Sequence, residues 1–309
     1  MEKTFKDTVS SADFEDIFTI VYYFVDESYK NFENMLKRSG PTPIFSDSEI
    51  ITLCLVNQMF NDSERAFYSY VWKNYHHLFP KMIDRTRYHR RCKDLYRIAN
   101  LIRLELLWKM DVDMQSHHVM DSMPVPVCKY ARASRNLTFA AEYGVNNDSL
   151  YGYCAAKKED YYGFKLHLLV TTQGIPAHFV LAPASHHDVS LAPEMLQSYR
   201  NLITVLGDKG YVGLEKKLKD KTDYQLIIQK RSNQIPNTKS EKKWLAIFRK
   251  TIETTNSQLA EQFNLQYSRA KSAWGLNSRV VYKIAAYTIS IFINFMAGLP
   301  LLNIKSLIF

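Results

Sequence analysis

The stretch SHHVMDSMPVPVC, residues 116–128, places a single acid between apolar residues and prolines. The residues before Asp121 predict the end of a short buried strand, and Asp121 stands where that strand runs out. Pro124 and Pro126 argue against further ladder pairing, because proline has no backbone N–H to donate. A carboxylate at such a place is costly unless it is paired or bound to a cation. Asp121 is therefore either a turn cap or a ligand, and acids at comparable places elsewhere favour the ligand.

A second acid occupies an equivalent place in VLGDKGYVG, residues 205–213. The apolar run before Asp208 predicts another strand, and Gly210 permits close backbone approach to a ligand. Ligands of open α/β sheets bind at the carboxyl ends of the strands. We therefore expect Asp121 and Asp208 to lie at the same edge of one sheet.

The third acid, Glu253, lies on a predicted helix, at the rim of its apolar side. Arg249 precedes it by one turn, so the alternative is an ordinary surface ion pair worth a few tenths of a kcal/mol. Together the three carboxylates suit Mg²⁺, which prefers hard oxygen ligands and leaves positions for phosphate and water. Two such ions, roughly 3.5–4 Å apart, activate an attacking oxygen and stabilise a leaving one. A zinc site would need His and Cys ligands instead.

The pattern along the chain predicts an α/β fold in which a mixed sheet with flanking helices follows an all-helical N-terminal domain. We expect domains at 1–112 and 113–309. Helix starts are predicted at Ser46-x-x-Glu49 and Asn61-x-x-Glu64, and near Asp84. After residue 115, we expect strands and a helix in this order: Tyr161–Thr172, Ile175–Leu181, a helix from an Asp188 cap to about Tyr199, Ile203–Gly207 and Tyr224–Ile228.

Charge and composition bear on partners and location. The net charge of +9 favours a polyanion such as nucleic acid, although a basic protein without such a partner is the alternative. The four cysteines are far apart and predict neither a zinc site nor a disulfide framework. Residues 284–304 carry no charge, but their polar residues favour a buried helix over a membrane span. With no signal region at its start, we expect a cytoplasmic protein that does not bind membranes.

One predicted helix is strongly basic. Residues 81–100 hold seven basic and two acidic side chains. Arg90, Lys93 and Arg97 fall on the side opposite its apolar stripe. This pattern is typical of a recognition helix in a DNA groove, and equally of a solvated basic face.

Five sequence motifs resemble those of one known protein family. They are DSMPVPVC around Asp121, YYGFKLHLL at 161–169, SHHD at 185–188, LGDKGYVG at 206–213, and Arg249-x-x-x-Glu253. In order and spacing they resemble the DDE transposases of bacterial insertion sequences over residues 115–298. The group numbered nine hundred and eighty-two is the suggested match.

The resemblance implies an RNase H-like catalytic domain whose metal ligands are Asp121, Asp208 and Glu253. It implies two Mg²⁺ ions, which Mn²⁺ could replace. It also implies cleavage of the element's ends, joining of the 3′-hydroxyls to double-stranded target DNA, and a homodimer that holds both ends. One departure is Ala260, near the place where neighbouring groups carry a basic residue two turns after the Glu.

Other cations near the acids are candidates for phosphate contacts. Lys165 and His167 share one face of a predicted strand, and Lys165 either holds a DNA phosphate or extends from the sheet into solvent. Lys209 neighbours Asp208, and Arg249 neighbours Glu253 on its helix. Two other functions remain open: a nuclease of the same fold without strand transfer, and a DNA-binding regulator without catalysis.

Overall fold

The structure is a computed structural model that describes residues 4–35, 40–60, 63–197, 199, 202–218 and 224–307. By its internal contacts the chain divides into two compact units. The first comprises residues 1–110, 261–264 and 274–309, and the second comprises 111–260 and 265–273. The first change of unit falls between residues 110 and 111, and the expected domains at 1–112 and 113–309 stay a prediction. The carboxyl-terminal segment groups with the amino-terminal helices, although we expected it with the sheet.

The first unit is built from helices: α1 (Phe5–Ser10), α2 (Phe14–Tyr29), α3 (Asp47–Phe60), α4 (Glu64–Asn74), α5 (Arg85–Lys109) and α10 (Ala273–Met296). The predicted capping box before α3 is confirmed, since Ser46 N donates to Glu49 Oε2 at 2.6 Å and Glu49 N donates to Ser46 Oγ at 3.1 Å. Asp84 caps α5 as expected. Ser63 caps α4, whereas Asn61 lies outside the described residues. Short 3₁₀ turns are η1 (Glu33–Met35) and η6 (Ile304–Ser306).

Helix α5 buries the apolar stripe that the sequence predicted, including Tyr88, Leu95 and Ile102. Arg90 and Arg97 are exposed on it. The uncharged segment of α10 is buried within the first unit. Among the described residues, no helix is both long and apolar enough to cross a bilayer.

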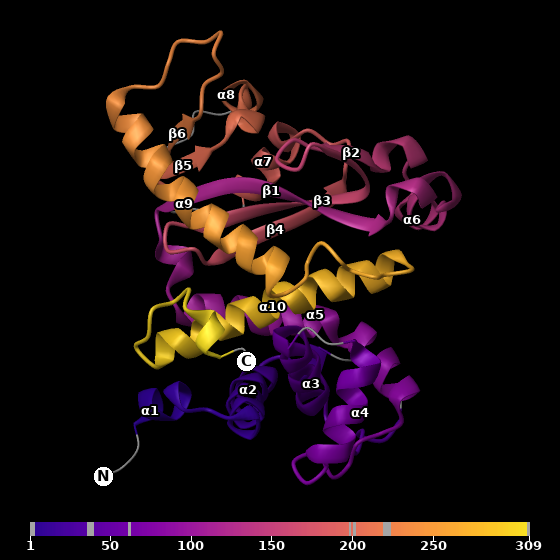
Figure 1. Cartoon of the computed structure of the whole chain (residues 1–309). Coiled ribbons are helices and arrows are strands. Elements are labelled where there is room, and N and C mark those ends of the chain that lie inside the picture. The colour runs from indigo at the N-terminus through magenta and orange to yellow at the C-terminus, as the bar shows by residue number, and fades with distance from the viewer. Residues whose placement is uncertain are drawn as a thin grey trace. The chain divides into compact units, whose positions relative to one another are not determined.

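The second unit contains a six-stranded mixed sheet with the order β2-β3-β1-β5-β6, and β4 also pairs with β3 (Figure 1). Its strands are β1 (His117–Cys128), β2 (Tyr151–Cys154), β3 (Glu159–Thr171), β4 (Pro176–Pro183), β5 (Thr204–Gly207) and β6 (Gln225–Ile228). Its helices are α6 (Thr138–Tyr143), α7 (Asp188–Gln197), α8 (Leu214–Lys217) and α9 (Lys239–Glu261), with 3₁₀ turns η2 (Val112–Met114), η3 (Tyr130–Arg135), η4 (Asn147–Leu150) and η5 (Lys209–Tyr211). The expected mixed α/β sheet is therefore confirmed; β2 was not predicted.

Strand β1 does not end at Asp121, and here the sequence expectation was wrong. The strand continues to Cys128 and pairs Pro124 with Lys165 of β3. On its other side the parallel pairing with β5 stops where Met120 meets Gly207. Beyond that point β3 is the neighbour of β1 within the described residues, so one edge is open and the prolines need not donate there.

The two faces of the sheet are covered by different helices. Met120 and Leu169 join Ala192 and Met195 of α7 in one buried apolar cluster. Figure 1 shows α9 lying across the strands. The Thr255 hydroxyl of α9 donates to the Gly174 carbonyl between β3 and β4 at 3.0 Å, and both residues are buried. Because strand residues alternate, Asp121 faces α9 while Met120 and Ser122 face α7.

Candidate active site

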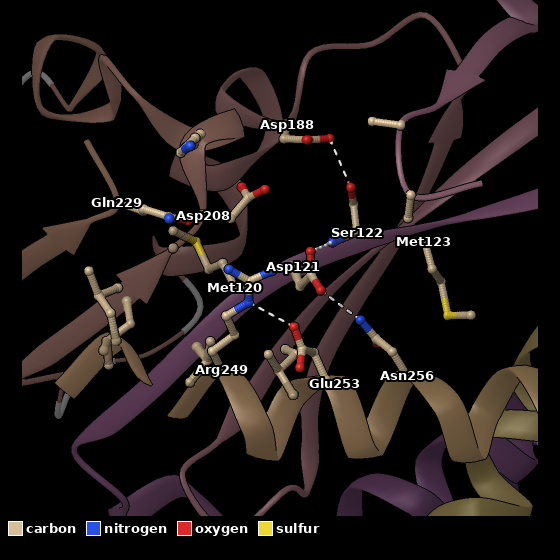
Figure 2. A pocket seen from close by; sticks show the side chains of 18 of the residues that line it. Met120, Asp121, Ser122, Met123, Asp188, Asp208, Gln229, Arg249, Glu253 and Asn256 are labelled. Atoms are coloured by element: carbon tan, nitrogen blue, oxygen red, sulfur yellow. Dashed lines mark hydrogen bonds and ion pairs between the residues drawn. The ribbon is translucent and has the colours of Figure 1, made fainter. Parts of the chain in front are cut away.

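The site lies where β5 ends beside β1. Met120 and Gly207 are the last parallel pair, and Asp121 and Asp208 follow them directly. Asp208 folds back on the turn after it, where its Oδ1 accepts from Gly210 N at 2.8 Å. Figure 2 shows Asp121 and Asp208 in one pocket, with Glu253 and Asn256 reaching towards it from α9.

The pocket belongs to the second unit and has a cavity volume of ≈ 1310 Å³. All three acids that the sequence singled out line it, and so does Asp188. Its lining also holds the cationic side chains Lys157, Lys165, Lys209, Lys230, Arg231, Lys242 and Arg249. Acids in a pocket that is also lined by many cationic side chains suit a polyanion that must meet a cation there.

Asp121 is partly buried and held at both carboxylate oxygens. Ser122 N donates to Oδ1 at 2.8 Å, and Asn256 Nδ2 donates to Oδ2 at 2.7 Å. Burial raises the pKa of Asp121 to about 7; the Ser122 N–H opposes this shift, and the charges of Asp208 and Asp188 add to it. Burial likewise raises the pKa of Asp208, against the Gly210 N–H. Both carboxyl groups therefore lie where a bound cation would stabilise the ionised form.

Glu253 forms an ion pair with Arg249, which was the alternative to a metal-binding role in the sequence analysis. Arg249 Nε donates to its Oε1 at 2.7 Å, and 59% of the Glu253 side chain is exposed. The carboxylate nevertheless lines the same pocket as Asp121, one helical turn before Asn256.

A family model described as a transposase DDE domain matches residues 113–289, more than half of the chain. This chain belongs to the transposase DDE domain family. Neither the curated proteins nor the solved structures gave a match. Membership supports transposase function, and with it a nucleotidyl-transfer enzyme that acts on DNA. The numbered insertion-sequence group stays a prediction.

The donor atoms of this DDE domain fit a hard divalent cation in their chemistry. They are carboxylate oxygens and an amide oxygen, Asn256 Oδ1, which is buried and has no hydrogen-bond partner among the described residues. Within that same part of the chain, no group of three or more His, Cys, Asp or Glu side chains is already arranged to hold a metal ion.

Asp188 of the DDE domain makes contacts in the pocket that the sequence did not predict. The sequence predicts Asp188 as the N-cap of a helix, and in the structure it is the first residue of α7. Its carboxylate also accepts from Ser122 Oγ at 3.1 Å and from Lys165 Nζ at 3.0 Å (Figure 2 for Ser122). The SHHD run was the available signal, but sequence alone did not show that Asp188 faces the strand carrying Asp121.

The basic residues predicted to contact DNA lie in both units. Lys165, Lys209 and Arg249 line the pocket in the second unit. Arg90, Lys93 and Arg97 lie on α5 in the first unit, where Arg97 Nε donates to the Tyr96 hydroxyl at 3.2 Å. Ala260 also lines the pocket, so a basic residue is missing there as the sequence indicated.

Proposed function

We propose that this chain is the transposase of a bacterial insertion sequence of the group numbered nine hundred and eighty-two. It cleaves the ends of its element and joins the 3′-hydroxyls to double-stranded target DNA. The observation that supports this most is the adjacency of Asp121 and Asp208 at the open edge of β1, in a basic pocket that Glu253 also lines. The matched family gives the same reaction class.

In this proposal Asp121, Asp208 and Glu253 hold two Mg²⁺ ions, for which Mn²⁺ substitutes. When bound, such ions activate the attacking oxygen and stabilise the leaving one. Asn256 orients Asp121 through its 2.7 Å hydrogen bond. Arg249 and Lys209 bind the phosphates on either side of the reacting one, and Arg249 thereby releases Glu253.

The helical unit and the assembly complete the proposal. Arg90, Lys93 and Arg97 on α5 contact DNA phosphates outside the pocket. The catalytic fold is RNase H-like, the protein acts in the cytoplasm, and a homodimer holds both element ends.

The experiment uses DNA carrying one element end, a target plasmid, and Mg²⁺ or Mn²⁺. The parent chain is expected to nick at the end and to join the 3′-hydroxyl to the plasmid. Asp208→Asn keeps the side-chain shape but removes the charge, so both products are expected to fall by about 10³-fold or more, the scale of losing one main electrostatic group. Lys305→Gln, on the η6 turn of the first unit, is the charge-changing control.

Three results would contradict the proposal in different ways. Cutting by Asp208→Asn at the parental rate would remove Asp208 from the site. Hydrolysis without any joined product would indicate a nuclease. Specific DNA binding with no cleavage in either metal would indicate a regulator.

A further inference from the structure

Asp188 carries more contacts than a helix start requires. Its Oδ1 accepts from Ser122 Oγ and Lys165 Nζ, and His167 Nδ1 lies 3.7 Å away. Only 18% of the Asp188 side chain and 19% of the Lys165 side chain are exposed. The ion pair is therefore a largely desolvated contact on the wall of the pocket.

The second oxygen of Asp188 points at the loop that carries Asp208. A Cβ built on Gly210 would lie 2.7 Å from Asp188 Oδ2 and 3.0 Å from Asp208 Oδ1. The two carboxylates thus converge above a glycine whose missing side chain leaves the space between them open. The φ angle of Gly210 is not positive, so flexibility is not the reason for glycine here.

His167 beside Asp188 is a second observation, because it is a buried polar side chain whose hydrogen-bonding capacity is unused. Its side chain is fully buried, and within the described part of the chain neither ring nitrogen has a hydrogen-bond partner. Asp188 Oδ1 lies 3.7 Å from His167 Nδ1, and it already accepts hydrogen bonds from Lys165 and Ser122. If Lys165 moves away from Asp188, His167 is placed to donate a hydrogen bond to Asp188 instead. Carboxylates that bind metals are commonly held by such hydrogen bonds.

We propose that Asp188 is a fourth acid of the site, which with Asp208 takes one divalent cation above Gly210, and that Lys165 is its counter-ion until the cation and DNA arrive. This rests on the proposed function and names the residues that serve one of its two ions. Lys165 then moves from Asp188 to a DNA phosphate, an exchange that keeps both charges paired. In the free chain Lys165 Nζ donates to Asp188 Oδ1 at 3.0 Å.

The test measures the Mn²⁺ dissociation constant of the full chain without DNA, by calorimetry and by the electron paramagnetic resonance of free Mn²⁺. Lys165→Met frees Asp188 and is expected to tighten binding about tenfold. Lys209→Met removes the same charge from the same pocket, but Lys209 is not the partner of Asp188, so a change under about threefold is expected. Asp188→Asn is expected to weaken binding by about 10- to 100-fold.

Gly210→Ala gives an independent arm. Its methyl group would fill the space between Asp188 and Asp208, so weaker Mn²⁺ binding by about tenfold is expected while Lys165 stays in place. Circular dichroism and the melting temperature identify any variant that fails to fold. The gain in affinity expected of Lys165→Met cannot come from unfolding.

Equal tightening by Lys165→Met and Lys209→Met would overturn the inference, because it would reflect only the net charge of the pocket. Parental Mn²⁺ affinity in folded Asp188→Asn would also overturn it. Either result leaves the proposed function standing if Asp208→Asn still loses cleavage. Parental cleavage by Asp208→Asn instead ends the proposed function itself.

Discussion

Among single residues, Asn256 has the contact that most directly sets the geometry of the site. Its Nδ2 holds Asp121 Oδ2 at 2.7 Å, and its position on α9 is one turn after Glu253. A fixed carboxylate loses less orientational freedom when it binds a ligand, so this amide preorganises the acid rather than reacting itself.

Replacing Asn256 tests that role. Asn256→Leu removes the donor but keeps the approximate volume, so cleavage is expected to fall by about 10- to 100-fold with DNA affinity nearly unchanged. Thr254→Ala on the same helix is the control, since its hydroxyl donates to the Lys250 carbonyl of the same helix at 2.9 Å. Single-turnover nicking and a gel-shift titration give the two readouts. A parental nicking rate in Asn256→Leu would show that Asp121 needs no such support.

A buried histidine makes stability depend on pH. Burial lowers the pKa of His118 from 6.5 to about 4, and His117 adds to the shift. Above pH 6.5 the folded and unfolded chains both hold it neutral. As the pH falls from 6.5 towards 4, the unfolded chain binds a proton that the folded chain refuses, so up to about 3 kcal/mol is lost from the free energy of unfolding.

Asp121 also titrates in this pH range, but its raised pKa increases the stability of the folded chain as the pH falls. The prediction is therefore made for the difference in unfolding free energy between variant and parent. His118→Leu is expected to retain about 3 kcal/mol more of its unfolding free energy than the parent between pH 7 and pH 4. Urea unfolding at several pH values measures it, with the exposed His76→Gln as control. Parallel curves for parent and His118→Leu would contradict the burial argument.

Among elements, α9 is the one on which the arrangement of the acids depends most. Its predicted apolar side and its acid were both readable from the sequence. The contact that positions α9 on the sheet was not readable from the sequence, because the Thr255 hydroxyl donates to the carbonyl of Gly174, 81 residues away in the chain.

Thr255→Val tests that contact. The shape is kept but the buried Gly174 carbonyl loses its donor, so the free energy of unfolding is expected to fall by about 1–3 kcal/mol. Thr254→Val, one position earlier and less buried, is the matched control and should change stability by about 0.5 kcal/mol or less. Urea denaturation decides it: equal losses in the two variants would mean that the Thr255 bond contributes nothing specific.

Element prediction succeeded where the sequence has an apolar run and failed where such a run is missing or interrupted by prolines. Strands β3 to β6 and helix α9 follow from apolar runs. Strand β2 is mostly half-buried and carries an exposed tyrosine, so its pattern resembles a loop. The extension of β1 past Asp121 was missed because prolines argue against pairing in general, whereas an edge that opens partway along a strand cannot be read from local sequence.

Across the whole molecule, the sequence indicated which strand-end acids lie close together, but not which segments group into one unit. Asp121 and Asp208 were expected together from strand ends alone, and they flank the same edge. Asp188 was not expected beside them, because its position depends on where α7 packs against the sheet. The assignment of residues 274–309 to the helical unit depends on tertiary contacts that no local pattern contains.

The basic helix gives a prediction at the scale of the full chain. Changing Arg90, Lys93 and Arg97 to Gln together should weaken DNA binding on all sequences alike. It should also reduce the slope of log affinity against log salt by about 2 to 3, since each phosphate contact contributes about 0.9. Fluorescence anisotropy across a salt series measures it, with Lys6→Gln in α1 as a control. An unchanged slope would assign these charges to a solvated face.

The central claim is that Asp121, Asp208 and Glu253 meet one bound cation cluster, although they are far apart in the chain. Iron-directed cleavage of the polypeptide tests it most directly, with Fe²⁺ in place of Mg²⁺ and ascorbate with peroxide as the radical source. The prediction is backbone cuts near all three acids, suppressed by excess Mg²⁺ and lost in Asp208→Asn. Cuts near one acid alone, or cuts that persist in Asp208→Asn, would contradict it.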